Sequence, residues 1–275
     1  MLWGTLDLHF SLAGFVVGCL VGVTGVGGGS LMTPLLIVVF GIAPSVAVGT
    51  DLLFAAATKT VGSVVHGFHR TIQWRIVGRL AAGSIPAAGV TLVILSLLHI
   101  RTGGARQLIM VVLSAALLIT AAVLVGRNRI TRAYADRVGD LNDRTIARCT
   151  VLLGASLGVL VTMSSIGAGV IGVTVLVLLH PRLSSARIVG CDIAHAVPLT
   201  LVAGLGHGAL GSLDPHVLVS LLAGSLPGVL IGSSVSARVP DVALRYVLAG
   251  LLACIGAKLA FEAPIYSVAT LSTAR

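Results

Sequence analysis

The chain has 275 residues, of which 56% are hydrophobic and only 10% are charged. Soluble domains carry about 25% charged residues, so this chain lacks the polar surface that a soluble enzyme, a disordered chain or a coiled coil needs. Its formal charge of +9 comes from arginines that lie mostly between apolar runs. Arginines in such loops orient a chain in a lipid bilayer, so the charge indicates a membrane protein rather than nucleic-acid binding. We therefore expect an all-α, polytopic transmembrane helical bundle.

Apolar runs separated by short polar segments predict about eight membrane spans, since roughly 20 residues cross a bilayer. The start of the chain has no Lys or Arg before its apolar stretch, so we interpret it as the first span rather than as a secretory signal. In chain order the runs are 10–41 (interrupted), 45–66, 76–99, 105–126, 146–180 (interrupted), 187–208, 215–236 and 243–262.

The longest polar stretch, 127–148, divides the chain into a first transmembrane repeat (1–126) and a second (149–275). Short Arg-rich loops stay in the cytoplasm, so we expect this linker on the cytoplasmic side. Three arginines fall on the same side if the spans on either side of residue 102 each cross once: Arg70, Arg75 and Arg79. The later arginines argue weakly for the opposite side: Arg182, Arg187, Arg238 and Arg245.

The two halves resemble each other. A shift of 141 residues aligns Asp51 with Asp192 and His66 with His207, together with many small and apolar residues of the stretch 48–86. Apolar matches arise easily in a membrane protein, whereas matching Asp and His residues do not. The pattern predicts an internal duplication, which is typical of secondary transporters. An even number of spans per half gives parallel repeats, and counting the broken helices as two crossings gives inverted ones.

Glycine-rich segments interrupt the first apolar run of each half, at 22–29 and at 162–169. Each glycine lowers helix stability by about 1 kcal/mol relative to alanine, so we expect the helices to break there. Unwound backbone at membrane depth is tolerated where it is buried in protein or lines a wet cavity. We therefore predict a substrate-binding cavity at the two breaks, formed by Thr24, Gly27, Gly28, Gly29, Ser30, Ser164, Ser165, Gly167, Ala168 and Gly169.

The glycines have two interpretations. A helix that begins after Gly29 would direct its free N–H groups and the positive end of its dipole at an anion. Alternatively, the glycines only allow close helix packing, as we expect for the GxxxG spacings of Gly14, Gly18 and Gly22.

Charged and titratable residues inside the spans are candidates for coupling or gating. A carboxylate within a membrane span is costly and is a functional hypothesis by default. Carboxylates and imidazoles can both change charge during a transport cycle. The aspartates also follow Pro44 and Pro181 closely enough to act as structural caps, and the lysine could instead extend to the membrane surface. The candidates are Asp51, Lys59, His66, Asp192, His195 and His207.

We expect no metal, no cofactor and no enzymatic activity. The four cysteines are widely spaced without a CxxC pair, and no three or four ligands converge in the sequence. The segment Gly154–Gly158 matches the GxSxG pattern of hydrolases, but it lies inside an apolar helix, where small residues serve packing.

Several segments resemble the sulfite exporter TauE/SafE family. They are Gly25–Gly29 followed by LMTPLLIVVFGIAPSVAVGTDL, then VVHGFHRTIQW and GRLAAGSIPAAGV, and in the second half SSIGAGVIGVTVL, VGCDIA and AGSLPGVLIGS. The chain departs from the family pattern in its thinner second glycine cluster, Gly167 to Gly169, and in Asp51, which stands where a polar uncharged residue is common.

The resemblance implies a multi-pass protein of the bacterial inner membrane that moves small sulfur-containing anions such as sulfite or sulfonates. We expect a secondary transporter, an exporter that is coupled to protons, whose partners are the anion and the lipid bilayer. The alternatives are a passive anion channel, a transporter of a non-sulfur organic anion, and a membrane enzyme.

Overall fold

The computed structural model of the chain describes residues 6–24, 29–68, 70–102, 105–139, 142–235 and 241–272. These ranges form ten helices and no strand, so the predicted all-α fold is confirmed. The helices are α1 (Leu8–Thr24), α2 (Gly29–Val38), α3 (Pro44–Phe68), α4 (Trp74–Thr102), α5 (Ala105–Gly139), α6 (Asp143–Ser164), α7 (Val170–Leu179), α8 (Ser185–Ala209), α9 (Pro215–Val235) and α10 (Asp241–Ser272).

The apolar runs of the sequence become these helices. Prolines stand at the first positions of α3 and α9, where their missing N–H costs no hydrogen bond. Asn142 caps α6, and its side chain accepts the Arg144 N–H at 3.4 Å. Among the described residues, five segments are long and apolar enough to cross a membrane: Trp74–Leu98, Arg106–Arg127, Asp143–Ser164, Ser185–Ala209 and Pro215–Gly232. The chain is therefore a multi-pass membrane protein.

Each interrupted run forms a re-entrant pair of helices. The rings of Phe10, near the start of α1, and Phe40, after the end of α2, lie 4.6 Å apart. Likewise Asp143, which begins α6, lines the same pocket as His180, which follows α7. In both pairs the second, shorter helix returns toward the end at which the first one began.

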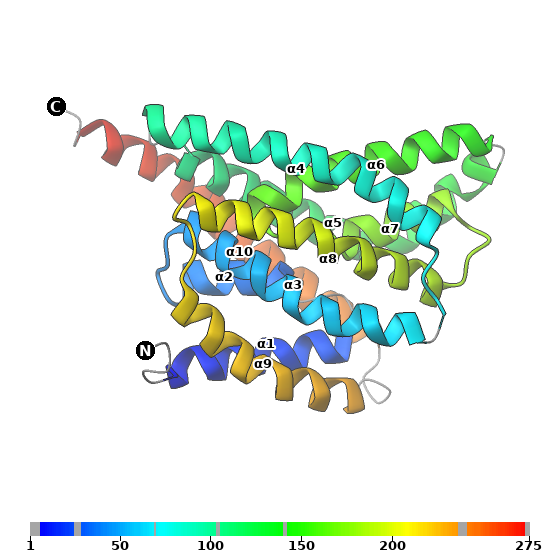
Figure 1. The fold of residues 1–275 in the computed structure, drawn as a ribbon, viewed down its shortest axis with the longest axis horizontal. Helices are drawn as coiled ribbons and strands as arrows, with labels where there is room; N and C mark the ends of the chain where they lie inside the picture. The colour runs from blue at the N-terminus through cyan, green and yellow to red at the C-terminus, as the bar shows by residue number, and fades with distance from the viewer. Residues whose placement is uncertain are drawn as a thin grey trace.

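Each long helix of the first half of the chain packs on a helix of the second half (Figure 1). Helix α1 packs mainly on α9, α4 on α6, α3 on α8 and α5 on α10. Helices α3 and α8 run antiparallel, because Gly62 faces Ile193 while Gly49 faces His207. The two helices that carry the aspartates aligned by sequence thus point in opposite directions through the bundle.

Small residues allow the paired helices to come into backbone contact. A Cβ on Gly14 or Gly18 of α1 would collide with the backbone of α9 at Leu221 and Ser225. A Cβ on Gly154 or Gly158 of α6 would collide with the backbone of α4, and the residues met there are Leu80 and Ser84. The packing interpretation of Gly14 and Gly18 is confirmed, and Gly154 to Gly158 is a helix contact.

One end of the bundle collects the arginines. Arg182, after α7, lines the same pocket as Arg75 and Arg79 of α4, and Arg245 lies within electrostatic range of Arg127. The expectation that Arg182 and Arg245 lie opposite the other arginines is therefore wrong, because the re-entrant α7 returns the chain to the end where α6 started. Arg238 lies outside the described residues. We call this end of the bundle the arginine end.

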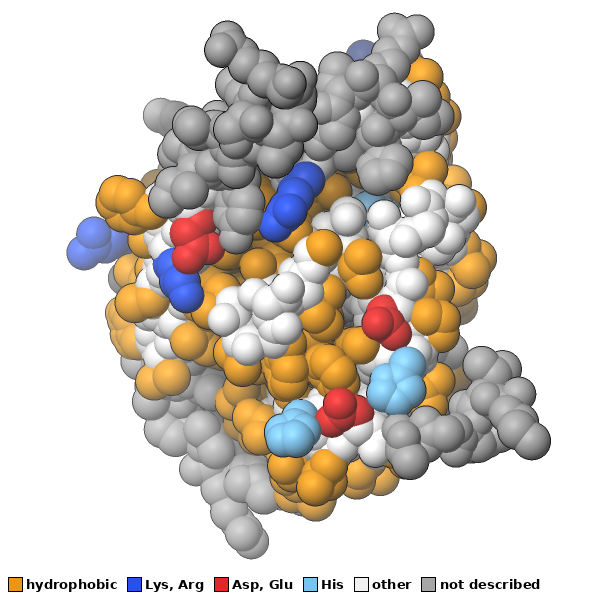
Figure 2. Space-filling model, turned by 90° about the vertical axis from the view of Figure 1, so that its left-hand side faces the viewer, with side chains coloured by type: hydrophobic (Ala, Val, Ile, Leu, Met, Phe, Trp, Pro, Cys, Tyr) orange, Lys and Arg blue, Asp and Glu red, His pale blue; other side chains and the backbone are white. Residues whose placement is uncertain are grey.

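The segment 127–148 is mostly helical. Helix α5 continues to Gly139, and α6 begins at Asp143. Figure 2 shows the opposite end of the molecule, the end at which α1 and α9 begin, where charged side chains are few and of both signs.

Replacing Gly154 by alanine should destabilise the bundle, because the new Cβ would collide with the Leu80 carbonyl. Overpacking of this kind costs about 1–3 kcal/mol. Gly89 of α4 is the matched control, since nothing lies within 4 Å of its Cβ position, and alanine there gains up to about 1 kcal/mol of helix propensity. Thermal unfolding in detergent should give a lower midpoint for Gly154→Ala only. Equal midpoints would contradict the close α4–α6 contact.

Candidate functional site

The second glycine break lies inside the bundle. Helix α6 ends at Ser164, and α7 begins at Val170. Gly167 and Gly169 have φ angles of 120° and 111°, a region that glycine occupies at little cost. Ser165 is also left-handed, at φ 58°, and its N–H donates to the Val161 carbonyl at 2.7 Å. The predicted interruption of this helix is confirmed.

The first glycine break lies only partly within the described structure. Gly27 and Gly28 fall outside the described residues, as do the side chains of Thr24 and Ser30. The flanking helices are described, and α2 begins at Gly29.

Asp51 lies in the eighth position of α3 and is completely buried. Its Oδ2 accepts two hydrogen bonds from Thr33 of α2, one from the backbone N–H at 3.1 Å and one from the hydroxyl at 2.5 Å. Thr33 lies in the first half of α2, near the positive end of that helix dipole. Asp51 does not cap the start of its own helix, as the cap interpretation requires, because α3 begins seven residues earlier at Pro44.

Asp192 occupies the matching position of α8 and is 2% exposed. The N–H of Gly169, which precedes α7, faces its carboxylate. A Cβ on Gly172 would overlap its Oδ1, so glycine is required for the close approach of α7 to α8. Each short re-entrant helix therefore presents backbone N–H groups near its start to the aspartate of the next helix.

Lys59 of α3 lies between the two aspartates. Its side chain is only 7% exposed, and it interacts electrostatically with Asp51, Asp192 and His195. It forms no ion pair within 4.0 Å with any described residue. The ammonium group of Lys59 is therefore buried inside the bundle and does not extend to the surface of the molecule.

The histidines divide between the cluster and its edges. His195 is buried beside the lysine, and its Nε2 shares a hydrogen bond with Ser84 Oγ at 2.8 Å. His207 is bonded through Nε2 to the Thr162 carbonyl at 2.9 Å, just before the second break. His66 lies two turns beyond Lys59 on α3, where its Nδ1 contacts Thr71 Oγ1 at 2.9 Å. Its ring also lies against Gly190 of α8.

The two serines of the second break differ. Ser164 Oγ donates to the Leu160 carbonyl at 2.6 Å and accepts the Ile166 N–H at 3.2 Å, so this hydroxyl supports the turn. Ser165 Oγ interacts with the Asp51 carboxylate but has no hydrogen-bond partner within 3.5 Å among the described residues. Of the two serines, Ser165 is the one whose hydroxyl lies next to a buried aspartate.

Unpartnered polar atoms converge on this part of the bundle. Leaving such an atom buried without a partner costs about 1–3 kcal/mol, so these positions call for water or for a ligand. Among the described residues the unpartnered atoms here are Asp51 Oδ1, Ser165 Oγ, Asp192 Oδ1, His195 Nδ1 and His207 Nδ1. We call the set of Asp51, Lys59, Ser165, Asp192 and His195 the central cluster.

The central cluster includes partners that sequence reasoning missed. Thr33 binds Asp51, and Ser84 binds His195. At the shift of 141 residues Ser84 matches Ser225 and Thr33 matches Thr174, so a repeat match was an available signal for both. The described residues hold no group of three or more His, Cys, Asp or Glu side chains that could bind a metal ion.

A helical bundle with re-entrant half-helices and a buried charged cluster is the architecture of a membrane transporter. The family model of the sulfite exporter TauE/SafE matches residues 10–259, so the chain belongs to this family. The resemblance stated from the sequence is confirmed, and the chain is a membrane transporter.

Curated relatives carry names of the same kind. "Probable membrane transporter protein YjnA" of Bacillus subtilis is 38% identical over 258 residues, 92% of this chain and 100% of the relative. "Probable membrane transporter protein YdhB" of the same organism is 30% identical over 239 residues, 84% of this chain and 91% of the relative. A relative from Methanocaldococcus jannaschii, "Probable membrane transporter protein MJ0441", is 25% identical over 205 residues, 70% of this chain and 69% of the relative. No solved structure matches the chain significantly.

Replacing Thr33 by valine should destabilise the protein, because the nearly isosteric change removes one of the two donors to the buried Asp51 carboxylate. The expected loss is about 1–3 kcal/mol, and Thr33→Ser should retain most of the stability. Thr174→Val is the matched control, since among the described residues the Thr174 hydroxyl bonds only to the Val170 carbonyl of its own helix.

A double-mutant cycle with Asp51→Asn isolates the pair. In that background Thr33→Val should cost less, because a neutral amide depends less on the lost donor. Additive losses in thermal unfolding would argue against a Thr33–Asp51 interaction.

Proposed function

We propose that this transporter moves small sulfur-containing oxyanions, such as sulfite or sulfonates, across the bacterial inner membrane, and that transport is coupled to protons. The observation that carries the proposal is the central cluster, in which Lys59 lies beside two carboxylates at the helix breaks. The substrate class follows the name of the family, and the relatives' names specify only membrane transport.

The charges of the cluster favour coupling between anion and proton. An oxyanion would be attracted by Lys59 and by the N–H groups at the starts of α2 and α7. The same N–H groups already face the carboxylates of Asp51 and Asp192. Two buried carboxylates repel an incoming anion, and protonation of either one removes part of that repulsion. Anion binding and proton uptake therefore support each other.

The arrangement of the halves supports alternating access. We infer that 1–126 and 149–275 are inverted repeats, since α3 and α8, which share the aligned aspartates, run antiparallel. In transporters with inverted repeats, the site lies between the halves and one half moves relative to the other. Asp51, Lys59 and Asp192 meet between α3 and α8, at such an interface.

We assign the arginine end to the cytoplasm, because Arg-rich ends of membrane proteins remain inside. With this orientation, export begins at the arginine end. By the same assignment the opposite end, which carries few charged side chains (Figure 2), is the periplasmic one.

Flux of labelled sulfite in proteoliposomes tests the function. Asp51→Asn and Asp192→Asn should each reduce flux driven by a pH gradient by roughly ten- to a hundredfold, the value of one lost charge-assisted interaction of about 1.5–3 kcal/mol. Glu262→Gln, which removes only a surface pair with Lys258, is the control and should transport normally.

The alternatives give different results in the same assay. A passive channel would show flux that follows the anion gradient and does not respond to the pH gradient. A transporter of non-sulfur anions would move labelled carboxylates and leave sulfite, thiosulfate and sulfonates outside.

Labelling of introduced cysteines tests the orientation. In a variant without the four native cysteines, Arg75→Cys should react with an impermeant maleimide only after cells are permeabilised. His9→Cys, at the exposed start of α1, should react in cells with a permeable outer membrane and an intact inner membrane. The reverse pattern would place the arginine end outside.

A further inference from the structure

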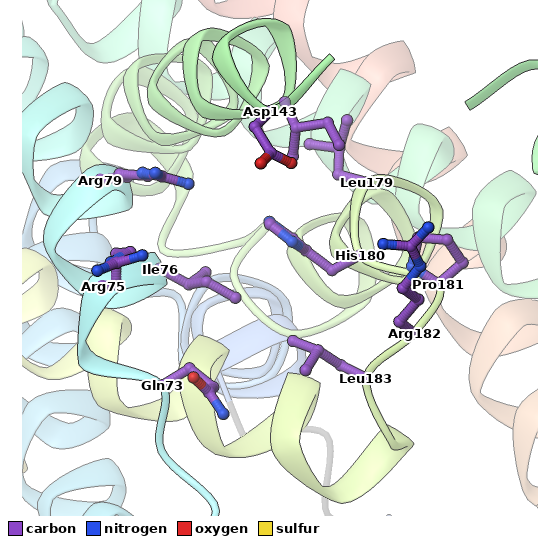
Figure 3. Close-up of a pocket in the computed structure, with 11 residues that line it drawn as sticks. Gln73, Arg75, Ile76, Arg79, Asp143, Leu179, His180, Pro181, Arg182 and Leu183 are labelled. Atoms are coloured by element: carbon purple, nitrogen blue, oxygen red, sulfur yellow. The ribbon is translucent and has the colours of Figure 1, made fainter. Parts of the chain in front are cut away.

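A pocket of about 400 Å³ opens at the arginine end, separate from the central cluster (Figure 3). The start of α4, the start of α6 and the turn between α7 and α8 form its walls. Arg75 and Arg79 line it from α4, Asp143 from α6, and His180 and Arg182 from the turn. Figure 3 shows the side chains of Arg79, Asp143 and His180 directed toward the space between them.

The pocket carries excess positive charge. Its lining contains three arginines and one aspartate. None of these arginines forms an ion pair within 4.0 Å with any described residue. Burial, and secondarily the Arg79 guanidinium, lowers the pKa of His180, so its imidazole is mostly neutral at pH 7 and can donate or accept a hydrogen bond. Its Nε2 lies 3.3 Å from Thr150 Oγ1. Guanidinium groups and a neutral imidazole together match the acceptor oxygens of an oxyanion.

Part of the pocket lining is apolar and belongs to a buried cluster that extends to α8. Ile76 and Leu179 line the pocket and also belong to a buried apolar cluster that contains Cys191. Gln73, another lining residue, donates its N–H to Cys191 Sγ at 3.2 Å. Cys191 directly precedes Asp192, so this buried apolar cluster, which we call the apolar layer, extends from the pocket lining to the residue next to the second carboxylate.

We propose that this pocket is a second oxyanion site, an entry vestibule in which Arg75, Arg79 and Arg182 bind the transported anion before the apolar layer opens. The proposal rests on the proposed function, because it assigns the vestibule to the same substrate as the central cluster. The phosphate of an anionic lipid headgroup has the same acceptor oxygens, and the lipid composition of the vesicles distinguishes it from the transported anion.

Equilibrium binding of labelled sulfite to the purified full-length transporter measures the site without transport. The wild type should bind two anions per chain, and Arg75→Gln/Arg79→Gln should bind one. Arg187→Gln, an exposed arginine at the same end that does not line the pocket, is the control and should bind two. One anion per chain in all three proteins would overturn the vestibule and leave the central site standing. No binding to any of them would instead contradict the proposed function.

Flux provides the second readout. With sulfite supplied at the arginine end, Arg79→Gln should raise the concentration for half-maximal flux about tenfold and leave the maximal flux unchanged, as expected when one charge-assisted contact to the substrate is lost. With sulfite supplied at the opposite end, that concentration should not change. An equal effect from both ends would contradict an entry site.

Vesicle composition distinguishes the lipid. The proposal predicts the same effect of Arg79→Gln in phosphatidylcholine vesicles with and without phosphatidylglycerol. If the variant differs from the wild type only when phosphatidylglycerol is present, the pocket binds lipid and the proposal is wrong.

Discussion

A carboxylate buried in an apolar bundle needs hydrogen-bond donors, and this requirement organises the protein. Asp51 and Asp192 obtain donors from backbone N–H groups near the starts of α2 and α7. Gly169 directly precedes α7, where N–H groups have no partner within the helix, and Thr33 lies one turn into α2, so a helix starts inside the bundle beside each aspartate. The glycines of the second break, with φ of 120° at Gly167, allow that start, and the re-entrant fold follows from it.

The central cluster is not symmetric, although the sequence halves align. Lys59 corresponds to Thr200 at the shift of 141 residues, so the second half has no equivalent cation. One buried ammonium group therefore interacts with two carboxylates, and one oxygen of each carboxylate has no hydrogen-bond partner among the described residues. Under our proposal an arriving oxyanion and a proton change this balance together, and the vestibule at the arginine end supplies the anion.

The fold was predictable because hydrophobic runs and glycine clusters act locally. The second helix break and the burial of both aspartates follow from composition and spacing alone. Individual partners did not follow, because they depend on backbone direction. Ser165 lies in a left-handed turn with its hydroxyl next to Asp51, while the hydroxyl of Ser164 bonds to its own helix. Arg182 was expected on the wrong side, since no sequence pattern shows that α7 turns back toward Arg75 and Arg79.

High-resolution electron cryomicroscopy with and without sulfite would show whether the central cluster is hydrated and binds the anion. We expect ordered water in contact with Asp51 Oδ1 and Asp192 Oδ1 in the ligand-free map. With sulfite, we expect new density in contact with Lys59 Nζ and Ser165 Oγ. A dry cluster in both maps, with these atoms bonded to one another and no anion density, would contradict this account of the central cluster.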